Sequence, residues 1–278
     1  MLIGYNTNGF AHHRLCDAIE ILAEIGYRAV AITLDHTILD PPDHRGVDRA
    51  IQLISNANRN FELRVTLETG ARFILDPRRK HQPTLISFEE CGRELRLKYL
   101  QAATEIAAAI NADSVSLWSG APDDRATETE LFDRLTASLE ILLQRTESTG
   151  VLFSFEPEPD MFVDSMTKFA RLQNALPHPR LGLTLDIGHL HCLHDGDLAN
   201  HVKQWHDRLW NIHIEDMHRG IHEHLPFGQG EMNFVHVFET LQDATYSGPI
   251  HVELPRQSHQ AAVIAEDSFR FIKNTLSK

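Results

Sequence analysis

Glutamate, aspartate and histidine recur in the second half of this chain, each within or directly after a short apolar run. Glu156 follows VLFSF, Asp186 ends LGLTLD, His213 lies in LWNIHIE and Glu253 lies in PIHVEL. If these segments converge, their carboxylates repel one another and lose hydration, so they must be protonated, paired with cations or bound to a metal. Three oxygen donors and one imidazole suit a divalent ion with open positions for substrate oxygens. We therefore predict one divalent metal, with Mn expected first and Mg, Co, Fe or Zn as alternatives; the competing interpretation is that each acid caps a helix or forms an ion pair.

Short β-branched segments alternate with longer segments of helical periodicity as far as the final helix, which is expected from about residue 260. The predicted strands are 2–6, 28–34, 62–68, 113–118, 151–156, 181–186, 209–215 and 249–254. Strands that are each followed by a helix must be parallel, so eight such units predict a single (β/α)8 (TIM) barrel domain over residues 1–278. An open doubly wound sheet is the alternative. In a barrel the carboxyl ends of the strands carry the chemistry, which would bring the four residues to one rim.

The composition narrows the classes of function. A net charge of −13 argues against a nucleic-acid partner, because such proteins usually present a basic surface. The apolar runs are short, and the N-terminus has neither a basic segment nor a long apolar core, so we expect no membrane span and a cytoplasmic location. Cys16, Cys91 and Cys192 are widely spaced and odd in number, which favours reduced thiols over a disulfide framework.

Five segments with candidate site residues follow one another in a fixed order. They are FSFEPEP (153–159), LTLDIGHLH (183–191), NIHIEDM (211–217), HLPFGQGEMNF (224–234) and HVEL (251–254). As an ordered set they resemble the signatures of the xylose isomerase-like barrel superfamily, often labelled sugar phosphate isomerase/epimerase. The resemblance runs through essentially the whole chain. It implies that the same four residues bind one divalent metal, that Glu156 and Glu253 also act as acid and base, and that His189 and Arg219 contact substrate oxygens.

The chemistry implied by this resemblance is proton transfer at carbon. A proton next to a ketone is too weakly acidic for a carboxylate unless the enediolate is stabilised, and a metal that chelates the carbonyl and the adjacent hydroxyl supplies that stabilisation. Return of a proton to the opposite face of the same carbon gives an epimer, and return to the neighbouring carbon gives an isomer. Expulsion of a hydroxyl or glycosyl group instead would make the enzyme a lyase or dehydratase.

One departure from the ketose epimerases concerns the substrate. These enzymes usually carry a further substrate-binding glutamate six residues after the first metal glutamate, but Phe162 stands at that position here. Glu158 is offered only two residues after Glu156, which argues against a D-tagatose or D-psicose type of substrate. Glu158 lies between prolines, where a rigid turn could aim it toward the substrate or present it to solvent.

The superfamily also contains apurinic endonucleases that bind three zinc ions. Aligned on GQG, His224 matches a zinc-binding histidine of those enzymes, His222 stands where they have an aspartate, and His189 matches the remaining ligand. A second metal bound by these three histidines is one expectation. The alternative for His222 and His224 is packing in the loop or around the metal ligands, and for His224 also a hydrogen bond to substrate or to the protein. Other endonuclease histidines are absent, because Glu68 and Trp118 stand at the ends of their strands.

Residues at the other strand ends are candidates for selecting the substrate. Glu68 ends the third predicted strand and Trp118 the fourth, while Asn8 follows the first. The Trp118 ring could stack on the apolar face of a sugar or simply pack in the wall. We expect a small sugar or polyol-derived substrate and a homodimer or homotetramer. The first hypothesis is therefore a metal-dependent sugar isomerase or epimerase, and the second is a lyase or dehydratase using the same site. An apurinic endonuclease and a non-catalytic pathway protein rank below these two.

Overall fold

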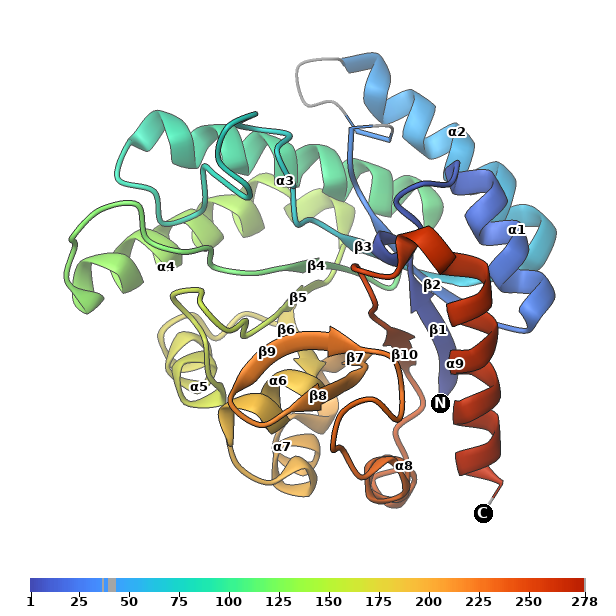
Figure 1. Ribbon diagram of the computed structural model, residues 1–278. Coiled ribbons are helices and arrows are strands. Elements are labelled where there is room, and N and C mark those ends of the chain that lie inside the picture. The colour runs from blue at the N-terminus through green and yellow to red at the C-terminus, as the bar shows by residue number, and fades with distance from the viewer. Residues whose placement is uncertain (37, 40–43, 278) are drawn as a thin grey trace. The chain divides into compact units, whose positions relative to one another are not determined.

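Eight parallel strands close into a barrel, which confirms the predicted (β/α)8 fold. The structure is a computed structural model that describes residues 1–36, 38–39 and 44–277. Around the barrel the strand order is β1-β10-β7-β6-β5-β4-β3-β2, and β8 and β9 form a separate two-stranded sheet (Figure 1). The strands are β1 (Leu2–Asn6), β2 (Ala29–Thr33), β3 (Arg64–Glu68), β4 (Ser114–Leu117), β5 (Phe153–Phe155), β6 (Leu181–Asp186), β7 (Leu209–Ile214), β8 (Asp216–His218), β9 (Ile221–Leu225) and β10 (Pro249–Val252).

The helices occupy the segments between these strands. They are α1 (Leu15–Ile25), α2 (His44–Phe61), α3 (Glu90–Ile110), α4 (Glu128–Arg145), α5 (Met166–Ala175), α6 (Ile187–Leu193), α7 (Leu198–Trp205), α8 (Phe234–Asp243) and α9 (Ala261–Leu276). Short 3-10 turns are η1 (Thr7–Phe10), η2 (Glu147–Thr149), η3 (His206–Arg208) and η4 (Ser258–Gln260). By its internal contacts the chain divides into two compact units, one of residues 1–32, 53–66 and 183–278, the other of 33–52 and 67–182.

In the first unit, four barrel strands pair side by side, with one register shift in the β6–β7 pair between Leu183 and Thr184. β1 pairs with β10, β10 with β7, and β7 with β6, all in parallel. Every residue of β6 is buried, as expected for a strand of a parallel barrel that is covered on both faces. Asp186, the last residue of β6, lies opposite His213 of β7. The carboxyl-terminal ends of β6, β7 and β10 therefore lie side by side along the barrel.

Two elements after β6 and β7 are absent from the sequence-based prediction. Helix α6 begins immediately after β6, and the antiparallel hairpin β8–β9 follows β7. The hairpin packs beside α6 (Figure 1), and its turn is pinned by a 2.9 Å hydrogen bond from the Gly220 amide to the carbonyl of Cys192. Gly220 has φ of +74°, a left-handed conformation that glycine adopts without strain. These two elements carry the histidines of the HEH segment and of LTLDIGHLH.

The loop after this hairpin is organised by Asp216. Its Oδ1 accepts hydrogen bonds from the amides of Met217 and Met232, at 2.9 and 3.1 Å, and its Oδ2 accepts one of 2.8 Å from Gly228. A Cβ on Gly230 would lie 2.4 Å from Oδ1, so the carboxylate needs a glycine there. Asp216 is thus fully used in shaping the FGQGEM loop.

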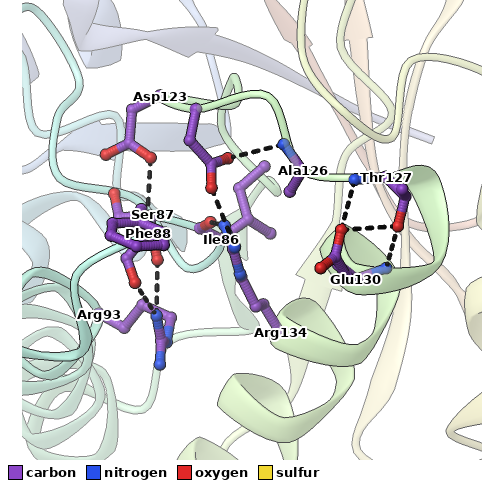
Figure 2. Close-up of polar contacts among 10 residues, drawn as sticks. Ile86, Ser87, Phe88, Arg93, Asp123, Ala126, Thr127, Glu130 and Arg134 are labelled. Atoms are coloured by element: carbon purple, nitrogen blue, oxygen red, sulfur yellow. Dashed lines mark hydrogen bonds and ion pairs between the residues drawn. The ribbon is translucent and has the colours of Figure 1, made fainter.

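In the second unit, hydrogen bonds and an ion pair connect the segments that precede α3 and α4 with each other and with these helices (Figure 2). Asp123 accepts a 2.8 Å hydrogen bond from the Phe88 amide, and Arg93 donates to the carbonyls of Ser87 and Phe88 at 2.7 and 2.8 Å. Arg134 pairs with Asp124 at 2.9 Å. The bonds from Arg93 and to Asp123 satisfy backbone groups of residues 87 and 88, shortly before α3.

Helix α4 of the same unit begins with a capping box. Thr127 accepts a hydrogen bond from the Glu130 amide, and the Glu130 side chain accepts one from the Thr127 amide (Figure 2). The two groups satisfy two of the unpaired donors at the helix start. The chain therefore enters α4 at a fixed point.

Candidate metal centre

Three of the four predicted metal ligands gather in the first unit. Each of Asp186, His213 and Glu253 offers one ligand atom, and these atoms lie within 4.8 Å of one another. The register explains the convergence, because Asp186 and His251 both lie opposite His213 on the strands that flank β7. Glu253, two residues beyond His251, points to the same side of its strand. The side chains of Asp186, His213 and Glu253 are 0%, 1% and 15% exposed.

Asp186 divides its two carboxylate oxygens between the helix and the site. Oδ1 accepts a 2.8 Å hydrogen bond from the His189 amide and so caps α6. Oδ2 lies 3.4 Å from Nε2 of His189 and has no hydrogen-bond partner among the residues that the structure describes. Burial raises the pKa of Asp186, but the neighbouring imidazoles, His189 foremost, outweigh it and lower that pKa below its ordinary value. Helix capping therefore uses one oxygen and leaves an ionised one for a cation.

Glu253 is held from both sides. Nδ1 of His213 lies 2.8 Å from its Oε2, and Nδ2 of Asn8 donates a 2.7 Å hydrogen bond to its Oε1. Burial by itself raises the pKa of Glu253, but the interaction with His213, which includes a hydrogen bond, lowers it well below the ordinary value. Glu253 is thus an oriented, ionised carboxylate, and Asn8 is a positioning partner at the start of η1.

Glu156 belongs to the second unit, where it directly follows β5. Its amide donates a 2.8 Å hydrogen bond to the carbonyl of Leu117, which continues the β4–β5 pairing, and its side chain is buried. Glu158 is half-buried, and its amide and carbonyl bond to Val163 and Met161, so the backbone turns there. Phe162, at the position where ketose epimerases carry a glutamate, is buried.

The three histidines predicted for a second metal lie together. His189 of α6 and His222 and His224 of β9 offer ligand atoms within 4.8 Å of one another. Their ring centroids are 4.9 to 5.9 Å apart. The two β9 histidines alternate along the strand and so share one face. Burial lowers the pKa of His189 to about 4. The three side chains thus lie close enough to share one ion, although neither α6 nor β9 was predicted, and their role as metal ligands stays a prediction.

Glu215 is a residue of this cluster that the sequence analysis did not single out. Its side chain is fully buried, and neither carboxylate oxygen has a hydrogen-bond partner in the described part of the chain. Nδ1 of His224 lies 3.8 Å from Oε2, and Asp186, Glu215 and His224 form a further group with the spacing of metal ligands. A Cβ on Gly188 would lie 1.9 Å from Oε1, so Gly188 makes the space for this carboxylate. The sequence could have identified Glu215, because residues 213 and 215 are two positions apart and an extended strand points both to the same face.

The pKa values of Glu215 and His224 are both raised, for different reasons. Burial, followed by the charge of Asp186, raises the pKa of Glu215 well above its ordinary value. Burial lowers the pKa of His224, but the interaction with Glu215 overcomes this and raises it to about 10. A buried acid next to an imidazole without a close hydrogen bond is an arrangement that a cation would relieve.

Two of the predicted substrate contacts lie in different settings. Arg219 is in the turn between β8 and β9, where its side chain is exposed and its amide donates a 2.7 Å hydrogen bond to Glu231. Glu68 ends β3, is buried, and accepts a 3.0 Å hydrogen bond at its carbonyl from the Leu34 amide. The substrate roles of both residues remain predictions.

Trp118, the residue after β4, is half-buried and has contacts on its ring. The guanidinium of Arg96 lies 5.2 Å from the ring centroid, and His81 meets the ring edge to face at 5.2 Å. Arg96 is buried and donates hydrogen bonds to the carbonyls of Thr69, His81 and Pro83. Because this arginine fixes the loop after β3, Trp118 has a clear packing role, and sugar stacking remains a prediction.

The family model for the xylose isomerase-like TIM barrel matches residues 19–275. The chain belongs to this family. Among curated proteins it is similar to L-ribulose-5-phosphate 3-epimerase of Escherichia coli strain K12, at 24% identity over 216 residues that cover 75% of each chain. No helix in the described ranges has the length and apolar character needed to cross a bilayer.

Solved structures support the same fold. The apo form of 3-keto-D-glucoside 4-epimerase from E. coli superimposes with a TM-score of 0.79 at 18% identity, covering 99% of both chains. The IolI protein with a bound zinc atom superimposes with a TM-score of 0.75 at 17% identity, covering 99% of this chain and 96% of that one. At such identities the superposition speaks for the barrel, and the chemistry of this chain has to be argued from its own residues.

Proposed function

We propose that this protein is a divalent-metal-dependent isomerase or epimerase of a sugar, keto-sugar or cyclitol. The observation that carries the proposal is the convergence of Asp186, His213 and Glu253, with ligand atoms within 4.8 Å and nearly complete burial. The epimerase activities of the family relatives support the reaction class.

The residues fit a divalent cation. Oδ2 of Asp186 is buried and lacks a hydrogen-bond partner among the described residues, and Glu253 is kept ionised beside His213. Carboxylate oxygens and an imidazole suit Mn, with Mg, Co, Fe and Zn as alternatives. We propose Glu156 as the fourth ligand, because it is a buried acid at the end of β5, the strand next to β6 in the barrel order.

Each residue then has a stated part in proton transfer. A cation in this site would stabilise the negative charge that develops on the substrate oxygens as a carbon-bound proton leaves. Glu253 accepts or returns that proton on one side of the substrate, with Asn8 fixing the direction of its carboxylate. Glu156 exchanges a proton on the other side. His189 and Arg219 are proposed to bind substrate oxygens, with Glu158, Glu68, Trp118 and His224 as further candidates for substrate selection.

A second cation bound by His189, His222 and His224 is a separate proposal. Three imidazoles within 4.8 Å suit zinc or a similar ion, and the buried Glu215 beside His224 adds negative charge nearby. Metal analysis of the zinc-reconstituted protein tests it. We expect two equivalents in the native protein and one in His222→Gln; a single equivalent in the native protein would exclude the second site.

Proton exchange in deuterated water tests the main proposal. The metal-reconstituted protein is incubated with ketoses, inososes and 3-keto-glycosides, and carbon-bound proton exchange is followed by NMR. Exchange with an epimerised or isomerised product supports the proposal. A new unsaturated product assigns a lyase or dehydratase instead, and the absence of exchange with every substrate class, despite bound metal, counts against both.

A further inference from the structure

A buried amide lies beside the candidate metal-binding histidine. Asn211 precedes His213 by two residues on β7 and is completely buried. Its Nδ2 is 3.1 Å from Nε2 of His213, and its Oδ1 is 2.8 Å from Nδ1 of His251. The other nitrogen of His213, Nδ1, faces Oε2 of Glu253 at 2.8 Å. A continuous chain of contacts thus runs from His251 through Asn211 and His213 to Glu253.

The chemistry of an amide constrains this chain. An amide has one end that only donates and one end that only accepts, whereas a neutral imidazole has one nitrogen of each kind. With Nδ2 of Asn211 facing it, Nε2 of His213 must accept, so the ring proton of a neutral His213 sits on Nδ1 and is donated to Glu253. Nδ1 is then unable to bind a cation, because metal ligation needs an unprotonated nitrogen.

Binding of a cation through Nδ1 reverses this arrangement. The ring proton must move to Nε2, where it needs an acceptor, and a half-turn of the Asn211 amide supplies Oδ1 at that place. The same half-turn presents Nδ2 to Nδ1 of His251, which must now accept. His251 has the space to be there because Gly4 lacks a Cβ, which would otherwise lie 2.4 Å from its ring carbon Cδ2.

We propose that Asn211 is a positioning residue that selects which nitrogen of His213 carries the proton, and that its amide turns over when the cation binds. The inference rests on the proposed metal centre but concerns residues that touch neither substrate nor cation. The orientation of the amide also determines which nitrogen of His251 carries its proton, so His251 changes tautomer together with His213.

Two readouts test the inference without measuring catalysis. Histidine 15N NMR of the metal-free and the zinc-loaded protein reports the tautomer of His213, assigned by comparison with His213→Gln. We expect a proton on Nδ1 in the metal-free protein and on Nε2 in the zinc-loaded one. A proton on Nε2 in both states would overturn the inference, because the amide would have no turn to make.

Metal affinity provides the second readout. We expect Asn211→Leu to weaken zinc binding by about 10- to 100-fold, the usual effect of losing a residue that orients a metal ligand. Asn211→Asp, which offers only acceptors, should retain native affinity or exceed it and should place the His213 proton on Nε2 even without metal. Tyr27→Phe, which removes a buried hydroxyl that donates a 2.8 Å hydrogen bond to the Ala265 carbonyl, is the control and should bind zinc as the native protein does.

The outcomes separate the inference from the proposed function. If the native protein binds no divalent metal after reconstitution, the proposed metal centre fails. If it binds metal but Asn211→Leu binds zinc as tightly as the native protein does, only the positioning role fails. A His213 proton on Nδ1 in metal-free Asn211→Asp contradicts that role as well. Thermal unfolding of each variant shows whether a loss of affinity reflects a loss of folded protein; Asn211→Asp keeps the test valid if Asn211→Leu does not fold.

Discussion

Nδ1 of His213 in β7 lies 2.8 Å from Oε2 of Glu253, the residue that follows the neighbouring barrel strand β10. The contact orients and keeps ionised the carboxylate that we propose as a base. It also places the two side chains where one cation could bind both. The first two predictions follow from this relationship and from the register of Asp186.

Replacing Glu253 by glutamine should abolish carbon-bound proton exchange and leave the fold intact. The amide keeps the shape of the carboxylate, and its oxygen can still accept a hydrogen bond from either Asn8 or His213, but it cannot accept a proton. NMR in deuterated water measures exchange, and circular dichroism checks the fold. Glu266→Gln, at an exposed ion pair on α9, is the control and should exchange at the native rate. Native exchange in Glu253→Gln would exclude the mechanism with two glutamates.

Asp186→Asn should weaken binding of the divalent metal by at least about tenfold, as expected when one charged ligand is lost. Asparagine caps a helix as well as aspartate does, so α6 should remain capped. Asp197→Asn is a matched control, since Asp197 caps α7 through a 3.2 Å hydrogen bond from the Asn200 amide. Equal metal affinities in the two variants, measured by calorimetric titration, would mean that Asp186 only caps the helix.

Gly188→Ala should destabilise the protein by about 1–3 kcal/mol through overpacking, because the new Cβ would lie 1.9 Å from Oε1 of Glu215. Helix propensity alone predicts the opposite sign, a gain of up to about 1 kcal/mol. Urea unfolding of the metal-free protein measures the change. Adding Glu215→Ala should recover most of the loss from Gly188→Ala, and a purely additive double variant would show that the two residues do not compete for space.

His81 should contribute to acid sensitivity. Its ring is largely buried and bonds to the Gly70 carbonyl at 2.6 Å; burial lowers its pKa to about 4. Because the folded protein resists a proton that the unfolded chain accepts, this contribution is present above about pH 6.5 and is lost as pH falls toward 4. We expect His81→Gln to flatten the loss of stability over this window by on the order of 2 kcal/mol. Exposed His259→Gln should follow the native curve, and a native slope in His81→Gln would contradict the prediction.

The fold and the convergence of three candidate metal ligands could be predicted from the sequence for a simple reason. Strand and helix periods alternate eight times, and parallel strands end at the same side of a barrel. Asp186 at the end of β6, His213 in β7 and Glu253 after β10 therefore lie close together, and this does not depend on the conformation of the loops. The register of Asp186 opposite His213 confirms this part of the argument.

The tertiary structure alone decided the surroundings of these ligands. Helix α6 spans only seven residues and the hairpin β8–β9 is polar, so neither shows a clear apolar period in the sequence. The burial of Glu215 depends on the missing Cβ of Gly188, and the role of Asn211 depends on two rings that meet it from different strands. Local pattern determines where a strand ends and which way its side chains alternate. Which polar groups are deprived of water, and must therefore find a proton, a partner or a cation, is decided only when distant segments pack together.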